Sequence, residues 1–146
     1  MFWRKKVKTS FGLRIIENGV PALPNVKIYE RALTIFIEEC VKRFDEIVIR
    51  HALSKAAVEW WDRVAPSINT GELNTVVVDD GQVYSGLAIG NFCKVAWRGR
   101  LHRSAFCHEL LHVVGLQLFG IDPFHQNGLL WSLERVVNTR LEAERL

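Results

Sequence analysis

The sequence predicts an α+β domain in which a β-sheet packs on helices. Residues 74–99 contain short runs rich in β-branched and aromatic residues, separated by glycine-containing turns, a pattern typical of strands. Residues 45–66 instead repeat apolar side chains at helical spacing and end at a proline. A second helical stretch follows Ser104, and a last amphipathic helix is expected over about Leu129–Leu141.

The first half of the chain supplies an arm and a backing helix. Residues 1–24 are predicted as an N-terminal arm or strand followed by a loop, because an Asn-Gly pair and prolines interrupt them. Residues 25–44 can form a short strand that runs into a helix, since their apolar positions settle on neither period. Residues 45–66 are predicted as one long backing helix, with Ile47 and Trp61 on its repeating apolar face.

The strands are expected between this helix and the next. Val76–Val78 should lead into a turn at Asp79–Gly81, and a second β-rich run covers Phe92–Trp97. Gly86 and Gly90 predict a loop or bulge between the two runs.

The next helix has recognisable ends. Ser104 is a good N-cap, the helix is expected from Ala105 to Gly115 or as far as Phe119, and Gly120 is available to terminate it. A loop then leads into the final helix.

Length and composition predict a soluble single domain over residues 1–146. Hydrophobic residues are 49% and charged residues 24% of the 146, and the net charge of +3 is well below the surplus of a dedicated nucleic-acid binder. Three widely spaced cysteines argue against a disulfide framework. The chain shows no secretory signal pattern and no apolar run of about 20 residues, so a cytoplasmic protein without a membrane segment is expected.

The chemistry is concentrated in the stretch SAFCHELLHVVG, where three titratable side chains interrupt an apolar run. At 100° per residue, His112 lies about 40° and Glu109 about 100° from His108 around the helix, so all three share one side. The leucines cluster on the opposite side, which should dock on the sheet and on the backing helix, with Cys107 among them as a small core residue. Two imidazoles one turn apart can bind one Zn²⁺ ion.

The pattern His-Glu-x-x-His is that of the zincin metallopeptidases. With ALSKAAVEWW, SGLAIG, an edge-like strand and HExxHxxG, the chain resembles the zincin fold over roughly His51 to His125, nearer to its metzincin branch. The resemblance implies a mixed sheet packed on a backing helix and an active-site helix. It also implies that the strand FCKVAWRG forms the upper rim of the cleft and pairs with an extended peptide.

Two departures leave the third metal ligand open. Leu118 stands where a metzincin has its third histidine, and the methionine of the Met-turn is missing because Met1 is the single methionine. His125, in a loop thirteen residues beyond His112, is the best candidate. Glu134 on the final helix would complete a gluzincin-like set instead. Asp122 fits a turn before a proline, or a hydrogen-bond acceptor for a ligand imidazole.

The predicted function is therefore zinc-dependent peptide hydrolysis. Zn²⁺ held by His108, His112 and His125 would activate a water molecule, and Glu109 would act as the general base. Tyr84 and His102 are possible oxyanion donors, although packing in a hairpin and surface exposure explain them equally well. The expected partner is a peptide or protein substrate, and the oligomeric state is open.

Two alternatives belong to other functional classes. A zincin fold that binds zinc without activity could serve as a scaffold, although a structural site has no need of Glu109. A nucleic-acid or protein-binding module would use a basic cluster, and such clusters are more often solvated faces. Its members are Arg4, Lys5, Lys6, Lys8, Trp97, Arg98, Arg100 and Arg103.

Overall fold

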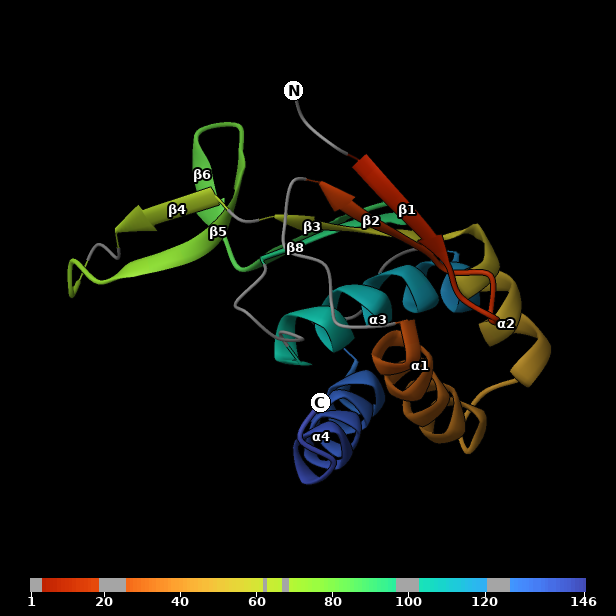
Figure 1. Ribbon diagram of the computed structural model, residues 1–146. Helices are drawn as coiled ribbons and strands as arrows, with labels where there is room; N and C mark the ends of the chain where they lie inside the picture. The colour runs from red at the N-terminus through yellow and green to blue at the C-terminus, as the bar shows by residue number, and fades with distance from the viewer. Residues whose placement is uncertain (1–3, 19–25, 62, 67–68, 97–102, 121–126) are drawn as a thin grey trace.

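The computed structural model describes residues 4–18, 26–61, 63–66, 69–96, 103–120 and 127–146. Within these ranges the chain forms an α+β domain, with helices beneath one face of a five-stranded sheet and a three-stranded sheet to one side (Figure 1). The helices are α1 (Val26–Val41), α2 (Glu46–Lys55), α3 (Arg103–Phe119) and α4 (Gly128–Ala143). None of these described helices is both long enough and apolar enough to cross a bilayer.

The larger sheet is mixed, as expected, and has the order β1-β2-β3-β8-β7. Strands β2, β3 and β8 run parallel to one another. At one end of the sheet β1 pairs antiparallel with β2, and at the other end β7 pairs antiparallel with β8. Parallel neighbours need long crossover connections, and α1 and α2 lie in the crossover from β2 to β3. The strands are β1 (Arg4–Lys8), β2 (Arg14–Asn18), β3 (Ala57–Trp61), β7 (Gly86–Ile89) and β8 (Phe92–Ala96).

The smaller sheet has the order β4-β5-β6 and is antiparallel throughout. Its strands are β4 (Arg63–Pro66), β5 (Leu73–Asp79) and β6 (Gln82–Tyr84). Asp80 and Gly81 both have positive φ, 49° and 74°, at the tip of the β5–β6 hairpin. This is the two-residue turn that an Asp-Gly pair favours, so the predicted turn is confirmed.

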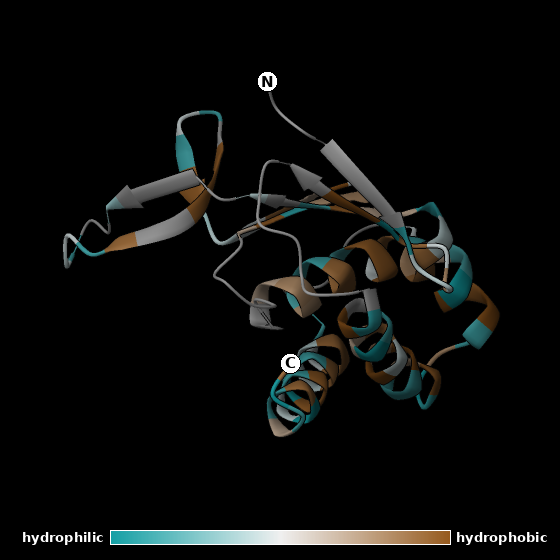
Figure 2. Cartoon of the chain, viewed as in Figure 1, coloured by the Kyte–Doolittle hydropathy of each residue, from teal (hydrophilic) through white to brown (hydrophobic). Residues whose placement is uncertain are grey.

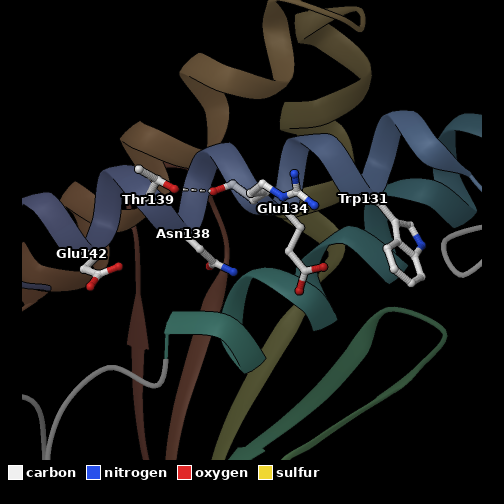
Figure 3. Close-up of a pocket in the computed structure, with 6 residues that line it drawn as sticks. Trp131, Glu134, Asn138, Thr139 and Glu142 are labelled. Carbon is white, nitrogen blue, oxygen red and sulfur yellow. Dashed lines mark hydrogen bonds between the residues drawn. The ribbon is translucent and has the colours of Figure 1, made fainter.

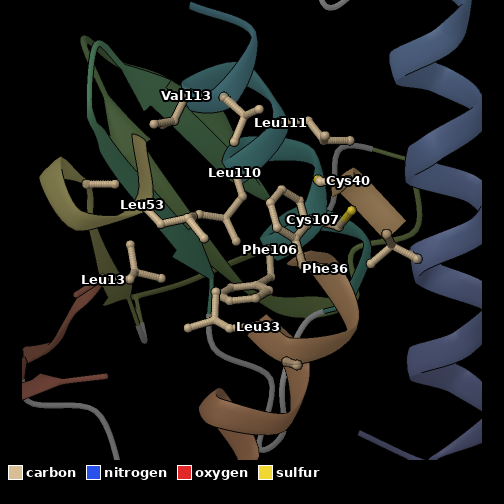
Figure 4. Packing of buried hydrophobic residues seen from close by; sticks show 14 of the residues in the cluster. Leu13, Leu33, Phe36, Cys40, Leu53, Phe106, Cys107, Leu110, Leu111 and Val113 are labelled. Atoms are coloured by element: carbon tan, nitrogen blue, oxygen red, sulfur yellow. The ribbon is translucent and has the colours of Figure 1, made fainter. Parts of the chain in front are cut away.

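Helix α3 lies at the centre of the hydrophobic core. Leu110, Leu111 and Val114 are buried, and in Figure 4 side chains of α3 meet those of α1 and α2. Burying one such side chain stabilises the fold by about 1.5–3 kcal/mol. Helix α4 shows alternating hydrophobic and hydrophilic bands (Figure 2) and packs against both α1 and α3. The apolar side of α3 is therefore held by helices and sheet together, which fixes the direction of its polar side.

The prediction of one long backing helix is wrong. Helix α2 ends at Lys55, Ala56 adopts extended backbone angles (φ −91°, ψ 161°), and residues 57–61 form the central strand β3. The sequence AVEWW that follows is rich in β-branched and aromatic residues, which favour strands. Pairing on both sides of β3 outweighs the helical spacing that Val58 and Trp61 happen to satisfy.

Two other regions are more regular than expected. Residues 26–41 form one helix, with no initial strand. Gly86 is the first residue of strand β7 and Gly90, with φ 59°, directly follows its last residue; neither forms a bulge, because Gly86–Ile89 pair in register with β8. Strand β8, in turn, lies between β3 and β7, so its predicted edge-like position is wrong, and β7 is the end strand among the strands that the structure describes.

The helix ends are close to their predicted positions. Helix α3 begins at Arg103, so Ser104 lies inside it and is not the N-cap. Gly120 has φ 75° directly after Phe119 and ends the helix as predicted. The side chain of Asn127 caps α4 by accepting hydrogen bonds from the amides of the second and third helical residues.

An ion-pair network joins α4 to α1. Arg140 donates to Glu39 Oε2 and to Glu38 Oε2, each at 2.8 Å, and Lys42 Nζ lies 2.9 Å from Glu39 Oε2. The Glu39 side chain is only 4% exposed. Burial alone would raise the pKa of Glu39, but the hydrogen bonds from Lys42 and Arg140 outweigh it and lower that pKa below its ordinary value.

We expect Glu39 to make the protein less stable in acid. A carboxyl with a lowered folded-state pKa contributes stability above its unfolded pKa of about 4.3, and that contribution is lost as pH falls through the folded value. Thermal melts between pH 3 and 7 should show the loss, and Glu39→Gln should flatten that part of the curve. Parallel curves for wild type and Glu39→Gln would contradict the assignment.

Candidate metal centre

The polar side of α3 brings three possible metal ligands together. Among the described residues, donor atoms of His108, Glu109 and His112 lie within 4.8 Å of one another. The Nε2 atoms of the two histidines are 3.1 Å apart, with ring planes inclined at 72°. Two nitrogens at this spacing can both lie about 2.0–2.1 Å from one ion, the ordinary zinc–nitrogen distance. The group can therefore hold a metal ion.

Exposure falls from the first histidine to the glutamate. The His108 side chain is 32% exposed, that of His112 is 15% exposed and that of Glu109 is 7% exposed. Glu109 Oε1 lies 3.9 Å from His112 Nε2. The carboxylate therefore lies beside the point on which the imidazoles converge, in surroundings with little water, as the helical spacing predicts.

Glu134 reaches this group from α4. Its Oε1 atom lies 3.1 Å from His108 Nδ1, the ring nitrogen opposite the one that faces His112. A carboxylate at this position accepts a hydrogen bond from Nδ1–H, which keeps the proton on Nδ1 and leaves the Nε2 lone pair available to a metal. Glu134 lies outside the group of converging donor atoms, so in this structure its carboxylate contacts a candidate ligand and not the point on which the donors converge.

The spacing of apolar residues in α4 already indicates that Glu134 lies on the inward side of this helix. Leu130, Leu133, Val137 and Leu141 are the buried residues of α4. Glu134 follows Leu130 by four residues and precedes Val137 by three, so it belongs to the inward side of the helix. This inward position is the signal that favours Glu134, already a candidate ligand from the sequence, as a residue of the site.

A groove along α4 borders Glu134. It encloses about 340 Å³, and in Figure 3 Trp131, Glu134 and Asn138 point to the same side of the helix. Asn138 Oδ1 is buried, with no hydrogen-bond partner among the residues that the structure describes. The lining residues are Trp131, Glu134, Arg135, Asn138, Thr139 and Glu142.

The neighbouring thiols are poor ligands. Burial raises the pKa of both Cys93 and Cys107, which keeps them protonated. Cys93 Sγ lies 3.4 Å from the backbone carbonyl of Glu109, to which it donates a hydrogen bond, and so ties β8 to α3 at this residue. Cys107 is fully packed in the core, as predicted.

Strand β7 contributes a residue that the sequence analysis did not assign to the site. A Cβ atom built on Gly86 would lie 2.7 Å from Glu109 Oε2. This contact joins residues 23 positions apart in the chain, and no local pattern announces it. The tight packing of β7 against α3 is therefore visible only in three dimensions.

Several predicted site residues cannot be placed. His125, Asp122, His102 and three members of the basic cluster, Trp97, Arg98 and Arg100, lie outside the described residues. Tyr84, the other possible oxyanion donor, is described and is exposed on β6. The identity of the third ligand therefore stays a prediction.

Comparison with known protein families, with curated protein sequences and with solved structures finds no match to this chain.

We expect Glu134→Gln to weaken metal binding at this candidate centre about 10- to 100-fold without unfolding α4. Loss of a carboxylate that orients a ligand imidazole has an effect of this size. Competition titrations with a chromophoric chelator would measure it, with Glu142→Gln, in the same groove, as the matched control. Unchanged affinity in Glu134→Gln would rule out the orienting role.

Proposed function

We propose that the protein is a zinc-dependent metallopeptidase of the zincin type. The observation that carries this proposal is the convergence of two imidazole nitrogens 3.1 Å apart, with one carboxylate beside them and a second behind His108. A chance pair of histidines on a helix would not require both carboxylates. The mixed sheet above the HExxH helix agrees with the zincin resemblance.

The side chains divide the work as follows. His108 and His112 would hold the ion, and His125 is proposed as the third ligand. Bound zinc would polarise a substrate carbonyl and acidify a water molecule. Glu109 would accept the proton of the attacking water and deliver it to the leaving amine. Glu134 would keep the His108 tautomer that presents Nε2 to the ion.

Strand β7 supports a polypeptide as the substrate. It is the end strand of the larger sheet among the described strands, and it lies against α3 beside Glu109. An extended peptide that adds to this edge would run alongside the predicted base, in the common mode of strand addition. The resemblance implies that residues 92–99 pair with the substrate at the rim of the cleft, and we propose β7 for this role in their place.

The direct test is hydrolysis of a defined peptide mixture by zinc-loaded protein, followed by mass spectrometry. We expect cleavage that stops with a chelator and returns when zinc is added. Failure to take up zinc would overturn the whole proposal. Zinc uptake without cleavage would favour the alternative of a zinc-binding scaffold.

A further inference from the structure

Strand β7 passes so close to Glu109 that a side chain at Gly86 has no room. An ideal Cβ at Gly86 would lie 2.7 Å from Oε2, 3.0 Å from Cγ and 3.2 Å from Cδ of Glu109. Carbon atoms in contact normally lie about 3.5–4.0 Å apart. One extra carbon atom would therefore displace the glutamate along most of its length.

The lack of space for a side chain, and not the backbone conformation, explains why position 86 is a glycine. Five of the glycines that the structure describes adopt positive φ, and Gly86 is not among them. Gly86 lies in a regular strand, where it pairs with Val95 of β8. An alanine could adopt such backbone angles without strain, so the close approach of Glu109 is the constraint on this position.

The surroundings of Glu109 restrict the directions in which a displaced carboxylate could move. Glu109 is buried, and His112 Nε2 lies 3.9 Å from its Oε1 atom. Moving away from β7 takes the carboxylate towards the imidazoles or turns it out of line with them. Either shift changes the distance over which a proton would be transferred.

We infer that Gly86 is a positioning residue, whose missing side chain sets the place of the Glu109 carboxylate beside the metal centre. The inference rests on the proposed function, in which Glu109 is the base. It also gives β7 two roles, because the strand that would pair with the substrate also fixes the base relative to that substrate.

The test compares Gly86→Ala with Gly128→Ala. Gly128 also lacks positive φ, and a Cβ there would meet no atom within 4 Å. We expect Gly86→Ala to keep one zinc per chain and a near-native melting temperature. Its kcat should fall about 100-fold, the scale for a misplacement of about 1 Å, with KM nearly unchanged. Gly128→Ala should match wild type throughout.

A double variant and a crystal structure make the test specific. In a Glu109→Gln background, Gly86→Ala should cause little further loss, because both changes act on the same group. The crystal structure of Gly86→Ala should show the Glu109 side chain displaced, a readout that holds even if wild type cleaves no peptide. Wild-type kcat in Gly86→Ala, or an unmoved Glu109 with β7 shifted instead, would overturn the inference.

Discussion

Glu109→Gln is expected to bind zinc as wild type does and to turn over peptide substrates about 10²- to 10⁴-fold more slowly, the usual contribution of a general base. The amide has nearly the shape of the carboxylate, so it fits the narrow space beside Gly86. It cannot accept a proton from water at neutral pH. The change therefore removes the chemistry and keeps the packing.

Zinc per chain and kcat on one preparation would check this result. Glu46→Gln is a suitable control, because Glu46 lies in the first turn of α2, with its side chain 56% exposed. Full activity of Glu109→Gln would eliminate Glu109 as the base. Joint loss of zinc and activity would instead make Glu109 a ligand, contrary to the proposed division of roles.

His112→Ala is expected to abolish stoichiometric zinc binding. One imidazole remains after this change, and the convergence of two Nε2 atoms 3.1 Å apart is lost. A ligand that binds only the folded state stabilises it by about 2.7 kcal/mol at 100 times its dissociation constant. Excess zinc should therefore raise the melting temperature of wild type but not that of His112→Ala.

His51→Ala provides the matched control for this experiment. His51 is exposed on α2, outside the group of converging donors, so its replacement should leave zinc content and the zinc-dependent melting shift unchanged. Elemental analysis after dialysis, together with melts in the presence and absence of zinc, measures both quantities. One tightly bound zinc per chain in His112→Ala would refute the assignment of the centre.

Features that depend on interactions within one element can be predicted from the sequence, and features that depend on contacts between distant elements cannot. The arrangement of His108, Glu109 and His112 depends on the geometry of one helix, which spacing alone dictates. The segment AVEWW forms a strand because β2 and β8 pair on either side of it, and their paired residues lie 43 and 35 positions away in the chain (Arg14 with Ala57, Ala57 with Phe92). Local spacing contains no information on such pairing, so the helical prediction extended past Lys55.

Residues of the site that come from other elements were harder to find. Glu134 lies on a helix whose inward side can be read from its periodicity, but its contact with Nδ1 of His108 depends on how α4 packs on α3. Gly86 gives no local signal at all, because its role is defined by the side chain of a residue on another element.

The docking of α4 affects when, during folding, the metal centre is completely assembled. Arg140 holds this helix on α1, and Glu134 reaches His108 only while the helix is docked. A copy in which α4 had not docked would lack the carboxylate that contacts the first histidine, even where the HExxH helix had formed. In a peptidase, whose potential targets include unfolded copies of itself, such a dependence would delay activity until the chain is no longer an easy substrate.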